Sequence, residues 1–121
     1  MARLVIAPQT TPGAYPALQP AAHSRDLTMT AGQVGDGNYA NLVEAKTIVI
    51  AYNSDTGAQT VNFTSVADPA TNRTGDITAY SLDAKAISLF GPFKAVGWSH
   101  GGQIWFDPSS ALVKFAVITL P

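Results

Sequence analysis

The stretch from residue 47 to residue 65 constrains the fold more than any other part of the chain. Residues 47–52 are rich in β-branched and aromatic side chains, which fit a pleated, half-buried surface. Residues 59–64 alternate polar and apolar side chains with a period of two, as a strand with one solvated face does. The residues between the two runs, 53–58, are turn formers and include Gly57. The pattern predicts an antiparallel hairpin.

Short strand-like segments continue along the chain, separated by turn residues. We expect strands at 25–30, with Leu27 and Met29 pointing inward, and then at 77–82, 86–90 and 103–106, with a short edge element at 93–98. Residues 112–120 are apolar on both faces apart from Lys114, which is typical of a central or covered strand. Residues 31–41, 66–76, 99–102 and 107–110 are expected to be loops. This spacing, without a helical period, predicts an all-β fold: a small antiparallel β-sandwich, jelly-roll-like or closed into a small barrel.

The first 25 residues differ in composition from the rest. Prolines recur at positions 8, 12, 16 and 20, and proline fixes φ and lacks a backbone donor, so neither a helix nor a central strand is expected there. The sequence predicts an extended, proline-rich N-terminal arm at 1–25 and a β-sandwich domain at 26–121. A solvated terminus is the alternative. Against it stand five apolar side chains, which we expect to bind a neighbouring subunit: Leu4, Val5, Ile6, Tyr15 and Leu18.

Composition and charge narrow the classes of partner. The 121 residues suit one domain, and only 12% of them are charged, about half of the usual ~25%. The net charge is −1 and the seven basic residues are scattered, so no nucleic-acid partner is expected. No apolar run approaches the ~18 residues of a membrane span. The chain has no cysteine, which excludes disulfides and thiolate metal sites.

Residue patterns for catalysis are not recognisable in the sequence. His23 and His100 have no second ligand at metal-binding spacing, and no Gly-x-Ser-x-Gly elbow occurs. The acidic residues fall mostly at expected turns, where they accept hydrogen bonds from the backbone. We therefore expect no catalytic residues, no metal and no cofactor.

The order of several short motifs resembles a known family. Residues 38–41 (Asn-Tyr-Ala-Asn) precede the strand-like run 48–53, a Thr/Gly loop and 60–63 (Thr-Val-Asn-Phe). Residues 76–82, the Phe-Gly-Pro-Phe of 90–93, 104–107 and the terminal apolar run 113–118 follow in turn. This order, over roughly residues 26–121, resembles the capsid cement or decoration proteins of tailed bacteriophages. The loop at 66–73 lacks the cysteine that many of those proteins have.

The resemblance implies a structural virion protein on the outer surface of the phage head, made in the host cytoplasm. Its partners would be the major capsid protein, whose neighbouring subunits it bridges, and further copies of itself, often as a homotrimer. Low charge and an apolar last strand agree with lateral packing of this kind. The aromatic candidates for self-association are Phe93, Trp98, Trp105 and Phe115.

Two other hypotheses remain open. A non-catalytic module that binds glycans or a host surface, on a virion or a secreted protein, could use Trp98, Trp105 or Tyr39 as a platform. A small enzyme ranks last, because no acid, base or nucleophile set can be named.

Overall fold

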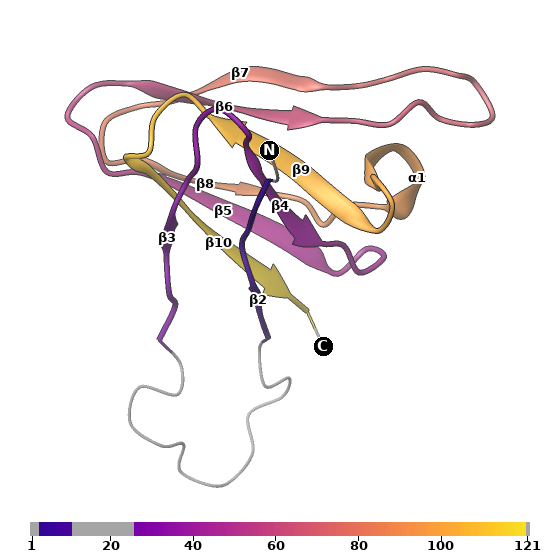
Figure 1. Ribbon diagram of the computed structural model, residues 1–121, viewed down its shortest axis with the longest axis horizontal. Helices are drawn as coiled ribbons and strands as arrows, with labels where there is room; N and C mark the ends of the chain where they lie inside the picture. Colours follow the sequence, from indigo (N-terminus) through magenta and orange to yellow (C-terminus); the bar gives the residue numbers. More distant parts are fainter. Residues whose placement is uncertain (1–2, 11–25, 121) are drawn as a thin grey trace, which may run out of the picture.

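The computed structural model describes residues 3–10 and 26–120, which form a sandwich of two mixed sheets with five strands each (Figure 1). This confirms the predicted all-β sandwich. The strands are β1 (Leu4–Val5), β2 (Pro8–Thr10), β3 (Thr30–Ala31), β4 (Asn38–Asn41), β5 (Thr47–Asn53), β6 (Gln59–Thr64), β7 (Ile77–Leu82), β8 (Ile87–Phe90), β9 (Gln103–Pro108) and β10 (Val113–Thr119). A single helical turn, α1 (Ala95–Trp98), occupies the place of the expected edge element.

The first sheet, called sheet A here, has the order β1-β4-β9-β6-β7. The second, sheet B, has the order β2-β10-β5-β8, with β3 pairing with β10 as well. Neighbouring strands are antiparallel except for two parallel pairs, β1 with β4 and β2 with β10. The strand β10 lies inside sheet B, as its apolar composition predicts.

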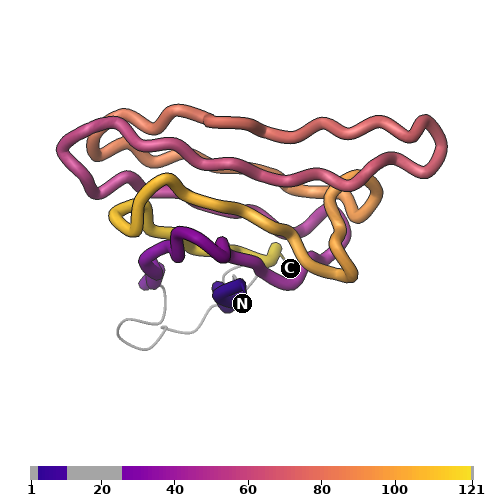
Figure 2. Tube along the Cα trace, turned by 45° about the horizontal axis from the view of Figure 1, so that its top comes forward, coloured from indigo at the N-terminus to yellow at the C-terminus, as the bar shows by residue number. Residues whose placement is uncertain are grey.

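The predicted hairpin of residues 47–64 is wrong. The strand β5 pairs with β10 and β8 in sheet B, whereas β6 pairs with β7 and β9 in sheet A. The turn residues between them therefore carry the chain from one sheet to the other. Among the described strands, β6 and β7 are the only pair that is consecutive in sequence and hydrogen-bonded, and Figure 2 shows this hairpin reaching beyond the other strands.

A buried asparagine explains why the chain crosses between the sheets at this point. Asn53 is fully buried at the end of β5, and its Nδ2 donates to the carbonyls of Gly57 at 2.9 Å and Leu82 at 3.0 Å. Its Oδ1 accepts the N–H of Asp55 at 3.0 Å. Because one side chain fixes both the β5–β6 and the β7–β8 connections, the turn chemistry that resembles a hairpin supports two crossings instead.

The core lies between the sheets and is joined across them by aromatic rings. Phe63 of sheet A packs against Phe90 of sheet B with ring centroids 4.6 Å apart, and against Phe106 at 5.8 Å. Phe106 in turn meets Phe115 of sheet B edge-on at 4.8 Å. Burying a ring of this size contributes about 2–3 kcal/mol, so these contacts are a main reason that the two sheets stay together.

Two local predictions also differ from the structure. Residues 31–41 are not all loop, because β4 forms there around the fully buried Asn38, whose amide binds the main chain of Gln33 and of Phe106. The expected strand at 25–30 is reduced to β3, and Leu27 is exposed instead of pointing inward. The strand β3 stays short because it shares one side of β10 with β2. β2 pairs with residues 117–119 of β10, which leaves residues 114–115 for β3.

Candidate interaction surfaces

The N-terminal residues that were predicted to reach a neighbouring subunit lie within the sandwich. Leu4 pairs with Asn38 in sheet A, Ile6 is 2% exposed in the core, and β2 pairs with β10 in sheet B. Residues 3–10 are therefore part of the sandwich and not of an arm that extends away from it. Proline at position 8 is tolerated because β2 is an edge strand. Of the predicted anchors among the described residues, Val5 alone is largely exposed, at 48%.

The remaining two anchors, Tyr15 and Leu18, lie outside the described residues, as do the prolines at 12, 16 and 20. The chain leaves the described part at Thr10 and returns at Asp26. Gln9 and Thr28 are joined by two hydrogen bonds, so both ends of this stretch are held at one edge of sheet B.

The four aromatic candidates for self-association occupy different environments. Phe93 is 4% exposed and Phe115 is fully buried, so neither offers a surface to another chain; the prediction is wrong for these two. Trp98 on α1 is partly buried against the core, edge-on to Phe93 at 5.1 Å. Trp105 lies on the outer face of sheet A, half-buried.

Trp105 is packed between two cationic or ionisable side chains. The guanidinium carbon of Arg3 is 4.4 Å from its ring centroid, and the His100 ring stacks on it at 3.8 Å and 6°. Arg3 approaches from the side of β1 and β4, and His100 from the side of β6, where its Nε2 lies 2.8 Å from the carbonyl oxygen of Thr64. Both faces of the indole are therefore covered.

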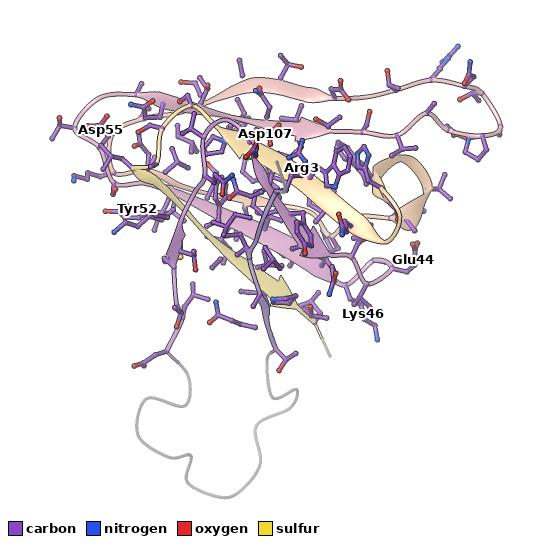
Figure 3. All side chains as sticks on the ribbon, in the orientation of Figure 1. Arg3, Glu44, Lys46, Tyr52, Asp55 and Asp107 are labelled. Atoms are coloured by element: carbon purple, nitrogen blue, oxygen red, sulfur yellow. The ribbon has the colours of Figure 1, made fainter. Side chains whose placement is uncertain are left out.

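An ion pair holds this stack on the outer face of sheet A. Arg3 pairs with Asp107 of β9 and also donates to the carbonyl of Asn38 at 3.2 Å (Figure 3). Gly37 makes room for this pair: its φ is +81°, and a Cβ atom at this position would overlap Asp107 and Arg3. The role of Arg3 was missed in the sequence, where a single basic residue near the terminus carries no pattern.

A serine, an aspartate and a histidine come close at the base of the β6–β7 hairpin. Asp76 accepts hydrogen bonds from the N–H and the hydroxyl of Ser65, each at 2.7 Å, and these bonds, together with the nearby charge of His100, lower the pKa of Asp76. No hydrogen bond joins Ser65 to His100 in the described part of the chain, and Ser65 is 8% exposed. The arrangement ties the base of the hairpin and does not form a nucleophile with an adjacent base.

Sheet B carries an apolar outer face. Along β5 the fully buried residues 47, 49, 51 and 53 alternate with residues that point to the outer face. The strand register places the following apolar side chains on that face: Ile48, Ile50 and Tyr52 of β5, Ile87 and Leu89 of β8, and Ala116 and Ile118 of β10. The charged member of the face is Lys114, beside Tyr52.

Exposure on this face is greatest along β8. Ile87 is 65% exposed and Leu89 is 70% exposed, whereas Ile50 is 7% exposed. The alternation of 87–90 was visible in the sequence and its strand was predicted, but not which side of the strand faces solvent. The missing information is the position of β8 at the end of the sheet.

Neither a metal site nor a membrane-spanning helix is found among the described residues. No group of three His, Asp or Glu side chains there is placed to hold a metal ion. No helix within 3–10 and 26–120 has the length and apolar composition needed to cross a membrane.

Comparison of the chain with protein-family models, with curated proteins and with solved structures finds no match.

Proposed function

We propose that the protein is a non-catalytic structural module that covers the outer surface of a phage head and bridges neighbouring major capsid subunits. The observation that carries this proposal is the outer face of sheet B, where apolar side chains from β5, β8 and β10 meet with Lys114 as their charged neighbour. Exposed apolar side chains gathered on one sheet face are typical of interaction sites. Together with the motif order described above, it favours a covering role.

The outer face of sheet B is the part that we propose to rest on the shell. Tyr52, Ile48 and Ile118 are each partly exposed on it and lie on neighbouring strands. The contact between one such face and one coat subunit is expected to be weak. An ordered shell presents many copies of the same coat subunit, so a module that touches two subunits gains from high effective concentration.

Residues 11–25 are the second proposed contact. Tyr15 and Leu18 remain proposed anchors for a neighbouring coat or cement subunit, and the sandwich would present them through the fixed ends at Gln9 and Thr28. A segment whose flanking residues are both fixed loses less entropy on docking than a free terminus.

The test compares binding of variants to isolated heads that lack the protein. We expect Ile118→Lys to reduce occupancy at least about tenfold, because an ammonium group in a desolvated contact costs more than about 1.4 kcal/mol. Val34→Lys is the matched control, since Val34 is 52% exposed and lies outside sheet B. Equal occupancy of both variants and the native chain would contradict the proposed face.

A second variant tests the segment. Replacing residues 11–25 by a short Gly/Ser linker keeps β1, β2 and β3, so we expect a folded protein with reduced occupancy on heads. Deleting the whole N-terminus would not serve, because Ile6 and the first two strands belong to the sandwich. Unchanged occupancy would remove the segment from the proposed function.

The glycan-binding alternative is not favoured at Trp105. A sugar stacks on a free aromatic face, and both faces of this indole are covered by Arg3 and His100. Binding of the purified protein to an array of glycans that is lost in Trp105→Ala would revive this alternative.

A further inference from the structure

No strand of the described residues pairs with the outer edge of β8, whose hydrogen-bonding groups point away from the sheet. Ala86 accepts the N–H of Asn53 at 2.9 Å, so this pair belongs to the hydrogen-bonded set of the antiparallel ladder. By alternation, Ser88 and Phe90 also bond to β5. The N–H and C=O groups of Ile87 and Leu89 therefore point to the free side.

The other sheet edges of the described chain are each protected against pairing. In sheet A, β1 has two residues, and β7 contains a register shift and Ala79 at φ +53°. On the far edge of sheet B, β2 begins with Pro8 and β3 has two residues. Short edge strands, bulges and prolines are the usual devices that prevent edge-to-edge association.

The strand β8 is twice as long as β1 or β3 and carries no bulge, proline or charge. Its four residues are Ile-Ser-Leu-Phe. The two residues whose backbone groups face outward, Ile87 and Leu89, are also the two most exposed large apolar side chains of the described residues. Unpaired backbone groups and uncovered apolar side chains thus coincide on one strand.

We propose that β8 pairs with β8 of a second copy of this chain, in an antiparallel register centred on Ser88. This register sets Ile87 opposite Leu89 of the second copy, and the reverse, and allows the outward N–H and C=O groups of both residues to bond. A second copy is the occupant because β8 is the one unprotected edge among the described strands, and its pattern is self-complementary and uncharged.

The geometry has two consequences for the assembly. Sheet B becomes continuous across a two-fold axis, so the outer faces of both copies form one apolar surface. Pairing along one short strand buries on the order of 400 Å² per copy, about half of the ~800 Å² typical of a stable complex. We expect a weak dimer with a Kd of about 10–100 μM, strengthened where copies are crowded on a surface.

Measuring the mass of the full chain by sedimentation over a range of concentrations tests the pairing. The native chain should shift from monomer to dimer, and Ile87→Lys and Leu89→Lys should each weaken the dimer at least about tenfold. Val96→Lys is the matched control, at 61% exposure on α1, and should change the Kd less than about twofold. Circular dichroism confirms that the variants stay folded.

A cross-link tests the register independently. The chain has no cysteine, so Ser88→Cys can form only an intermolecular disulfide. In the proposed register the two Ser88 residues form a non-hydrogen-bonded pair with Cα atoms about 4.5 Å apart, within the range of a disulfide. We expect oxidation to convert Ser88→Cys largely to dimer, and Ser81→Cys, exposed on the protected strand β7, to cross-link far less.

The inference is independent of the proposed function, and the outcomes separate the two. A monomer at every concentration, a trimer such as the phage resemblance implies, a dimer unaffected by Leu89→Lys, or equal cross-linking of the two cysteine variants would each overturn the β8 pairing. A β8 dimer that fails to bind heads would leave the pairing intact and contradict the proposed function. A monomeric native chain whose head binding is lost in Leu89→Lys would assign the edge to a strand of the coat protein instead.

Discussion

Gln9 and Thr28 are joined side chain to main chain by two hydrogen bonds: Gln9 Nε2 donates to the carbonyl of Thr28 at 2.7 Å, and the N–H of Thr28 donates to Gln9 Oε1 at 3.0 Å. The pair joins the two described segments, 3–10 and 26–120, at one edge of sheet B. The N-terminal strands are thereby part of the sandwich, and their contribution to stability can be measured.

Ile6 is the residue through which the N-terminus stabilises the core. Because its side chain is 2% exposed, we expect Ile6→Ala to lower the free energy of unfolding by about 2–4 kcal/mol in urea denaturation. Val5→Ala, at a position 48% exposed, should change it by less than about 0.5 kcal/mol. Equal effects of the two substitutions would mean that the first strands do not contribute to the core in solution.

Asn53 should be among the most sensitive polar positions. Its buried amide bonds to the main chain at Asp55, Gly57 and Leu82, and Asn53→Ala leaves these groups without a partner. We expect a loss of about 2–4 kcal/mol in the free energy of unfolding. Asn41→Ala, an exposed position on β4, is the control and should have a small effect. A small effect of both would show that water replaces the amide.

Gly37 and Gly35 form a matched pair for testing the Arg3–Asp107 contact. Both have positive φ, +81° and +95°, but a Cβ atom at Gly35 meets nothing within 4 Å. Gly35→Ala should therefore cost about 1 kcal/mol from backbone strain alone. Gly37→Ala should cost about 2–4 kcal/mol, because it also displaces the ion pair. Thermal unfolding of both variants measures the difference, and equal losses would indicate that the pair shifts without cost.

The stability of the protein should depend on Asp76 at acid pH. Hydrogen bonds from Ser65 hold the pKa of Asp76 below its ordinary value of 3.8. A carboxylate whose pKa is lower in the folded state stabilises that state above the unfolded pKa, and this stabilisation is lost as the pH falls through the folded pKa. The contribution should thus be complete above about pH 5 and decline below about pH 4.

Asp76→Asn keeps an acceptor for Ser65 and removes the titration. We expect its urea midpoint to fall less steeply than that of the native chain as the pH drops below about 4. Ser65→Ala is the companion variant and should move the pKa of Asp76, measured by NMR of the carboxyl carbon, back toward 3.8. Parallel pH profiles for all three proteins would contradict the assignment.

The candidate surfaces were only partly predictable. Trp105 was singled out as an aromatic on the surface, and it is half-buried there, but the cover provided by Arg3 and His100 comes from segments about 100 residues and 5 residues away in sequence. Phe93 and Phe115 are of a residue type that is common in protein interfaces, but they lie in the core. Ile87 and Leu89 are of residue types that are common in cores, but their side chains are exposed to solvent.

Local pattern by itself determined the strand class of this protein. β-branched residues, alternation and turn formers placed β5, β6, β7, β8, β9 and β10 close to their observed positions. These signals act between residues that are neighbours in the chain, so they need no knowledge of the rest of the fold.

The tertiary structure alone decided which strands pair and which face of each strand is covered. The runs at 47–53 and 59–64 look like a hairpin, yet they lie in different sheets. β5 pairs with β10 along all seven residues and with β8 along four, and Asn53 stabilises the crossing to β6. Whether an apolar side chain is buried depends on what lies beyond its strand. No described strand lies beyond β8 in sheet B, and for that reason Ile87 and Leu89 are exposed.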